Sequence, residues 1–136
     1  MIDTLRPLQA AALMRISLGV MFLAHSIILK LVTLGMPATT HYFSSLGLPG
    51  WLAYPVVVAE VASGMLLILG VKTRLVALLD IPLLAGTIIV EHGHHGWFFA
   101  SPGGGWEYPA FLIVTCVSVA LSGGGSTGSR PTGSNL

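Results

Sequence analysis

Residues 51–71 form a stretch of 21 residues in which Glu60 is the only charged side chain. A helix that crosses a bilayer needs about 20 predominantly apolar residues, so this stretch can span a membrane by itself. Three further apolar stretches, separated by Gly/Pro-rich or charged segments, cover 10–31, 73–90 and 106–121. Because irregular backbone exposed to lipid would leave peptide groups without hydrogen-bond partners, we expect all four stretches to span.

The expected fold class is therefore all-α, an integral membrane four-helix transmembrane bundle. It occupies residues 1–122, and residues 123–136 form a flexible Gly/Ser-rich C-terminal tail. Only 8% of the 136 residues are charged, against about a quarter in soluble domains, which excludes soluble globular and disordered proteins. The net charge of +1 offers no basic surface to nucleic acid. Cys116, the only cysteine, excludes an intramolecular disulfide, a CxxC redox pair and a thiolate metal cluster.

Basic residues fall mainly on one side of the expected bundle. With four spans, the N-terminus, the 70–74 turn and the C-terminus share a side that holds Arg6, Arg15, Lys72, Arg74 and Arg130. The other side holds only Lys30. Because cytoplasmic segments are enriched in Lys and Arg, we expect a multi-pass protein with both termini in the cytoplasm.

The longer connections lie on the outer side of this arrangement. Residues 39–46 are expected to form a short interfacial helix. Aromatic residues are expected to form a belt at the same surface: Trp51, Tyr54, Trp97, Trp106 and Tyr108. The first apolar stretch also has features of a signal peptide, but hydrophobic sequence resumes at Ile27 after the loose cleavage pattern. We therefore expect an uncleaved first helix.

Four ionisable residues fall inside the expected spans, where charge is costly and often functional: Arg15, His25, Glu60 and Asp80. We expect them to face the bundle interior. From their depth along the helices, at ~1.5 Å per residue, we predict an Arg15–Asp80 pair and a His25–Glu60 pair. The alternatives are a structural role in helix packing and a polar site within the membrane.

The outer segment 91–95 contains three histidines, His92, His94 and His95. Imidazole binds Zn, Cu, Ni and Fe, so these residues are candidate metal ligands, with His41 and Glu107 as potential neighbours. The compact spacing matches none of the structural zinc patterns. The alternative is a solvated, partly protonated loop at the lipid headgroups.

Several motifs, taken in order, resemble the DoxX family of small bacterial and archaeal inner-membrane proteins. They are RISLG at 15–19, His25 followed by Lys30, FSSLGLP at 43–49, Glu60, LILGVKTR at 67–74 and GGWEYP at 104–109. Family members often carry a His-Gly pair with Lys four residues after the His. Here Ser26 stands in place of that Gly, and Lys30 comes five residues after His25.

The resemblance implies a four-helix bundle in the inner membrane and an association with redox complexes, because the family is named after subunits of a thiosulfate:quinone oxidoreductase. No cofactor-binding motif is found in the sequence. The cofactor that the resemblance implies is quinone. Three functions stay open: an accessory subunit of a quinone-linked oxidoreductase, a non-enzymatic scaffold, and a small metal- or solute-handling protein using His92, His94 and His95. The expected partners are the bilayer and either partner subunits or further copies of the chain.

Overall fold

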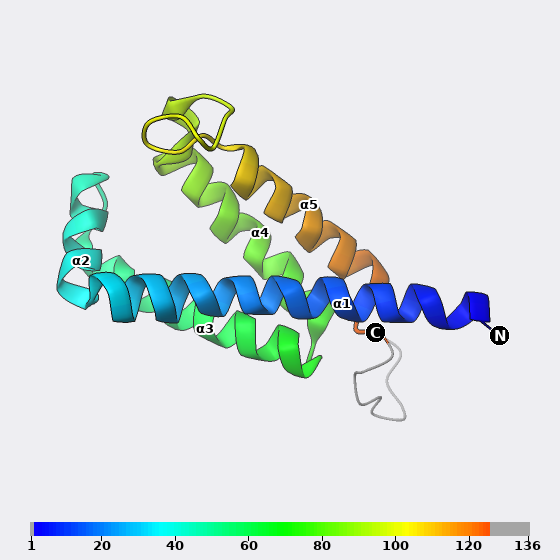
Figure 1. Cartoon of the computed structure of the whole chain (residues 1–136). Helices are drawn as coiled ribbons and strands as arrows, with labels where there is room; N and C mark the ends of the chain where they lie inside the picture. The colour runs from blue at the N-terminus through cyan, green and yellow to red at the C-terminus, as the bar shows by residue number, and fades with distance from the viewer. Residues whose placement is uncertain (1, 126–136) are drawn as a thin grey trace.

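The computed structural model describes residues 2–125 and is helical over most of that range (Figure 1). The tail predicted for 123–136 lies, from residue 126 on, outside the described residues. In chain order the helical elements are α1 (Ile2–Leu23), η1 (Ala24–Leu34), α2 (Met36–Ser45), η2 (Gly50–Leu52), α3 (Ala53–Leu69), α4 (Thr73–Val90), η3 (His92–His95) and α5 (Glu107–Ser122).

The first helix is longer than its predicted span of 10–31, because α1 begins at Ile2 and continues into η1, which ends only before Gly35 with its φ of +77°. η1 is a π-helix, in which hydrogen bonds join residues five apart. The hydroxyl of Ser26 donates to the carbonyl of Phe22 at 2.7 Å, and that of Thr33 donates to the carbonyl of Ile28 at 2.8 Å. Such hydrogen bonds from side-chain hydroxyls to backbone carbonyls compete with the regular α-helical hydrogen bonds. This competition favours the wider π-helical turn.

Among residues 2–125, three helices are long and apolar enough to cross a membrane: Pro7–Leu34, Gly50–Leu69 and Thr73–Val90. The fourth apolar helix, α5, has 16 residues and is therefore ~24 Å long, shorter than the ~30 Å hydrocarbon core. The chain is thus a multi-pass membrane protein with three long apolar helices and one shorter one. The short helix predicted over 39–46 is α2, which begins three residues earlier than expected, after Gly35 and with Pro37 in its first turn.

The helices form two antiparallel pairs, α1 with α3 and α4 with α5. The pairs meet near the α3–α4 turn and diverge toward α2 and η3 (Figure 1). A common core joins them: Leu18, Phe22, Leu67, Val76, Ala77, Leu84, Leu112, Cys116 and Val119. Many large apolar side chains outside this core are exposed, including Leu13, Val58, Leu79 and Phe111, as expected for surfaces that face lipid.

Small residues let α1 and α3 approach closely. A Cβ atom added to Gly19 would lie 2.8 Å from the carbonyl oxygen of Gly64, and one added to Gly64 would lie 2.8 Å from that of Gly19. The small-residue setting of Glu60 therefore marks close helix packing, as predicted.

The start of α1, the α3–α4 turn and the end of α5 lie at one end of the bundle. A Cβ atom added to Gly123 would lie 3.2 Å from Nε of Arg74, and one added to Gly125 would lie 2.6 Å from the carbonyl oxygen of Leu8. Within residues 2–125 these three segments thus lie close together at one end of the helices.

Candidate functional site

A buried ion pair joins the first and second long helices. The ammonium of Lys30, on η1, donates to both carboxylate oxygens of Glu60, on α3, with Nζ 2.6 Å from Oε1 and 2.7 Å from Oε2. Glu60 is 7% exposed and lies in the middle of the Gly50–Leu69 span. Burial of Glu60 confirms that it faces the bundle interior, and Lys30 neutralises its charge there.

The π-helical turn explains why Lys30 reaches Glu60. In an α-helix, side chains five residues apart point about 140° away from one another. In a π-helix such residues lie one hydrogen-bonded turn apart, so His25 and Lys30 share a face of η1. The predicted His25–Glu60 pair was wrong, because this turn brings Lys30 to Glu60.

His25 instead faces the second helix pair. Its ring stacks on that of Tyr108, with ring centroids 6.1 Å apart and an interplanar angle of 23°. Tyr108 belongs to the first turn of α5, so the contact crosses from η1 to the other pair of helices. Sequence reasoning placed Tyr108 in the aromatic belt and missed this contact, which depends on the path of α5.

Asp80 of α4 is bound to α3. Its Oδ1 atom accepts a hydrogen bond from the Ser63 hydroxyl at 2.6 Å, and the residue is 2% exposed. Ser63 follows Glu60 by three residues, so the two lie on adjacent parts of the same helix surface. We predicted Arg15 as the partner of Asp80, whereas the structure gives Asp80 the hydroxyl of Ser63.

Arg15 is buried against the C-terminal end of α3. Its Nη1 atom donates to the carbonyl of Ile68 at 2.8 Å and also to that of Leu67. The last carbonyls of a helix have no partner within the helix and carry partial negative charge. Arg15 therefore caps α3, a role that the sequence did not indicate.

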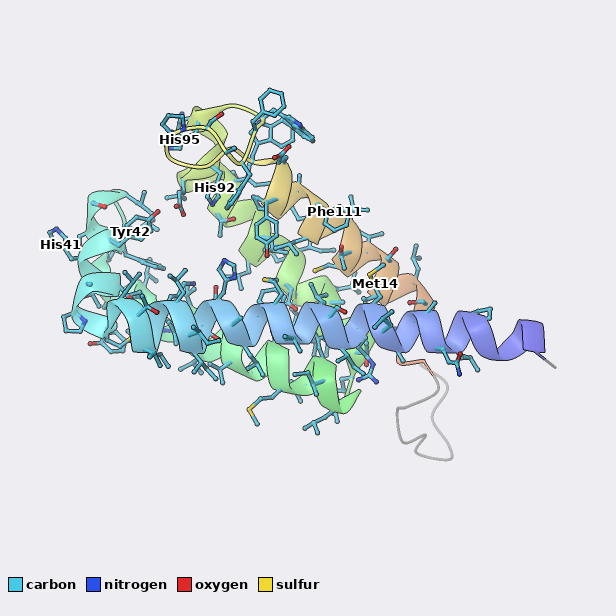
Figure 2. All side chains as sticks on the ribbon, in the orientation of Figure 1. Met14, His41, Tyr42, His92, His95 and Phe111 are labelled. Atoms are coloured by element: carbon cyan, nitrogen blue, oxygen red, sulfur yellow. The ribbon has the colours of Figure 1, made fainter. Side chains whose placement is uncertain are left out.

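The outer histidines do not converge. Nδ1 of His92 donates to the carbonyl of Gly104 at 2.8 Å, and the His95 ring packs against Gly103. His41 lies on α2, well away from both (Figure 2). Within the described part of the chain, no three His, Cys, Asp or Glu side chains are placed to hold a metal ion.

A hydrogen bond links α2 to the loop end of α4. The Tyr42 hydroxyl donates to Oε1 of Glu91, which follows the last residue of α4. Figure 2 shows Tyr42 on the side of α2 that faces this end of the bundle. Burial and the neighbouring Glu91 carboxylate raise the pKa of Tyr42. No sequence pattern pointed to this bond, because its partners are 49 residues apart.

Three half-buried residues with hydrogen-bonding groups lie along η1 and at the start of α5: Lys30, His25 and Tyr108. Lys30 is held by Glu60, and His25 lies one turn from Lys30 on the same face. We call these four residues the polar centre. Arg15 and Asp80 lie outside it and bind α3 at other positions.

Comparisons with known proteins agree with the motif order. A family model described as DoxX matches residues 10–93. The protein named "Putative oxidoreductase CatD" from Bacillus subtilis (strain 168) is 32% identical over 111 residues, which cover 82% of this chain and 77% of that protein. No solved structure matches significantly. The family match includes Lys30 and Glu60 and ends before α5.

Proposed function

The chain belongs to the DoxX family, and we propose that it is an accessory membrane subunit of a quinone-linked oxidoreductase complex. The name of its B. subtilis relative supports an oxidoreductase context. A partner subunit supplies the electrons, because Cys116 is the only cysteine and so the chain has neither a CxxC pair nor a thiolate cluster.

The polar centre is the observation that carries this proposal. A quinone accepts electrons and protons at its two carbonyl oxygens, and it is carried in the apolar phase of the bilayer. The Lys30 ammonium and the Tyr108 hydroxyl are donors that such oxygens accept from. The His25 imidazole offers a further hydrogen-bonding group beside Tyr108, and Glu60 keeps Lys30 in place.

The fourth pass and the orientation belong to the same proposal. α5 packs along the whole of α4 and ends beside Arg74, at the same end as the start of α1. A short apolar helix next to three long ones can cross where the bilayer thins locally. The basic residues at this end, Arg15, Lys72 and Arg74, support a cytoplasmic location of both termini in the plasma membrane.

A non-enzymatic scaffold is the second candidate, and one observation favours it. The buried polar groups each join two helices: Lys30 with Glu60, Ser63 with Asp80, and Arg15 with the end of α3. Such ties fix helix packing without any chemistry.

The substitution Glu60→Gln separates the two candidates, because it keeps the shape of the side chain and removes its charge. Membranes that contain the variant are compared with wild-type membranes for the rate of quinone reduction and for the proteins that co-purify. A quinone role predicts a slower rate with unchanged partners. An unchanged rate contradicts that role, and loss of the partners indicates a scaffold. His41→Gln serves as the control, since His41 is exposed and points outward from α2 (Figure 2).

A further inference from the structure

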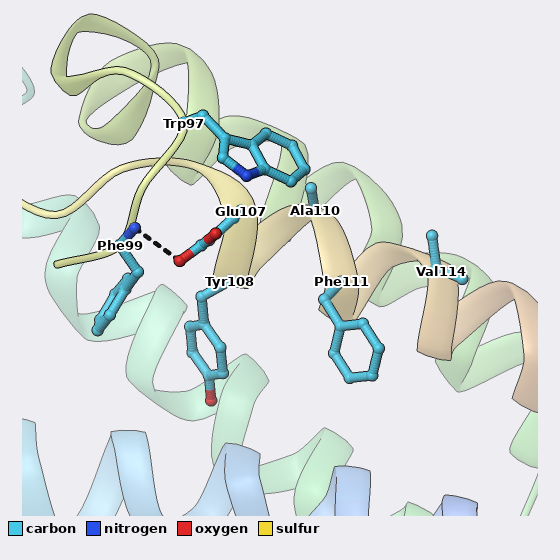
Figure 3. A pocket seen from close by; sticks show the side chains of 7 residues that line it. All are labelled: Trp97, Phe99, Glu107, Tyr108, Ala110, Phe111 and Val114. Carbon is cyan, nitrogen blue, oxygen red and sulfur yellow. Dashed lines mark hydrogen bonds between the residues drawn. The ribbon is translucent and has the colours of Figure 1, made fainter. Parts of the chain in front are cut away.

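A groove of about 570 Å³ lies between the 96–106 loop and α5 (Figure 3). One end is walled by the aromatic rings of Trp97, Phe99 and Tyr108, with the Glu107 side chain between Trp97 and Phe99. The groove lies beyond residue 93, where the family match ends. Its volume is in the range of small-molecule sites.

The ring end is held in shape by contacts within the loop. The backbone N–H of Phe99 donates to Oε1 of Glu107 at 2.9 Å. The rings of Trp97 and Trp106 meet edge to face with centroids 4.5 Å apart, and those of Phe99 and Tyr108 lie 5.3 Å apart. Among the described residues, no other hydrogen bond to the Glu107 carboxylate is found. The carboxylate therefore keeps acceptor capacity for a ligand.

The other end of the groove is apolar. It runs along α5 over Ala110, Phe111 and Val114, and Val114 follows the other two by about one helical turn. Phe111 and Val114 are 65% and 63% exposed, and both side chains project from the α5 ribbon (Figure 3). The lining of the groove thus changes from charged and aromatic residues at the loop to apolar residues along α5.

The charged aromatic end and the apolar end together indicate which class of ligand fits the groove. A carboxylate beside the faces of aromatic rings attracts an organic ammonium ion by charge and by cation–π interaction. Among residues 2–125, no Lys or Arg lines the groove, so a headgroup with only negative charge finds no counter-charge from this part of the chain. The apolar end fits a hydrocarbon chain that lies along the helix.

We propose that this groove binds a membrane lipid with an ammonium headgroup, phosphatidylethanolamine. The ammonium lies between the rings and against Glu107, and one acyl chain follows α5 past Phe111. Because Tyr108 also stacks on His25, the bound headgroup abuts the polar centre. The proposal does not depend on whether that centre binds quinone.

Native mass spectrometry of the full chain in detergent tests the proposal. The protein is titrated with dioleoyl phosphatidylethanolamine or dioleoyl phosphatidylglycerol, which share their acyl chains and differ in headgroup charge. We expect wild-type protein to retain the ethanolamine lipid about tenfold more than the glycerol lipid, the effect of one charge-assisted contact. Equal retention of both lipids by wild-type protein overturns the proposal without any variant.

Two variants locate the site. Glu107→Gln is expected to lower retention of the ethanolamine lipid to that of the glycerol lipid. The control Glu91→Gln removes a carboxylate from the same end of the bundle, outside the groove, and leaves retention unchanged. Phe111→Ala is expected to weaken both lipids equally, because it removes the contact with the acyl chain.

Two competition experiments separate other ligands. Free ethanolamine is not expected to displace the lipid, and displacement at equal concentration would show a site for soluble amines and contradict the lipid assignment. A short-chain quinone is not expected to displace it either. Displacement that depends on Glu107 would make the groove a quinone site and overturn the proposal.

Discussion

Lys30 and Glu60 form an ion pair across the interface of η1 and α3, with the ammonium bound to both carboxylate oxygens at 2.6 Å and 2.7 Å. Their side chains are 17% and 9% exposed. This largely buried pair fixes the rotation of one helix against the other, because any turn of η1 would leave one of the charges without its partner.

Removing the ammonium alone should therefore cost more than removing the pair. We expect Lys30→Ala to destabilise the bundle by about 3–5 kcal/mol, since it leaves a buried carboxylate without a counter-charge. The double variant Lys30→Ala/Glu60→Gln should recover much of this loss. Unfolding of the four proteins of this cycle in detergent gives the coupling energy. A coupling energy near zero would show that the pair does not hold η1 to α3.

The π-helical turn also predicts how deleting or inserting one residue in η1 affects the ion pair between Lys30 and Glu60. Deleting Ile28, a lipid-facing residue of η1, places the lysine four residues after His25, which in a regular α-helix again puts both on one face. We expect this variant to keep the pair with Glu60 and to lose the π-helical turn. Inserting an alanine at the same place should break the pair. Amide hydrogen exchange of 24–34 and thermal unfolding distinguish the two variants, and equal stability of both would contradict this explanation.

Much of the fold follows from the sequence because lipid imposes one strong rule, that a spanning backbone satisfies its own hydrogen bonds. The apolar run at 73–90 predicts α4 with the bounds that the structure shows, Thr73–Val90. Burial of Glu60 and Asp80 follows from the cost of charge in lipid. The partners of these two residues could not be predicted from the sequence, because pairing depends on how each helix is rotated about its axis. The change from α- to π-helical hydrogen bonding moves Lys30, in place of His25, onto Glu60.

Close packing of α1 on α3 can be tested at Gly64. A Cβ atom there would lie 2.7 Å from Cγ of Leu23 and 2.8 Å from the carbonyl oxygen of Gly19. We expect Gly64→Ala to destabilise the protein by about 1–3 kcal/mol through overpacking. Gly86→Ala is the matched control, since no atom of the described residues is found within 4 Å of its added Cβ. The control should be neutral or stabilising by up to about 1 kcal/mol, from helix propensity. Similar thermal unfolding of both variants would contradict the close contact.

The bond between Tyr42 and Glu91 predicts a dependence of stability on alkaline pH. The pKa of Tyr42 is raised in the folded protein by burial and by the Glu91 carboxylate. A group whose folded pKa exceeds its unfolded value stabilises the fold below the unfolded pKa, here about 10, and this contribution is lost as the pH rises further. We expect the unfolding temperature of wild-type protein to fall above about pH 10.

The variant Tyr42→Phe assigns this alkaline loss to the bond between α2 and α4. It removes the hydroxyl that donates to Glu91, so its unfolding temperature should be lower than that of wild type near neutral pH, and the difference should shrink as the pH rises. Tyr54→Phe is the control, because Tyr54 is exposed at the same end of the bundle and makes no side-chain hydrogen bond within residues 2–125. An alkaline loss that is the same in wild type and in Tyr42→Phe would assign it to other groups and leave the link between α2 and α4 without an energetic role.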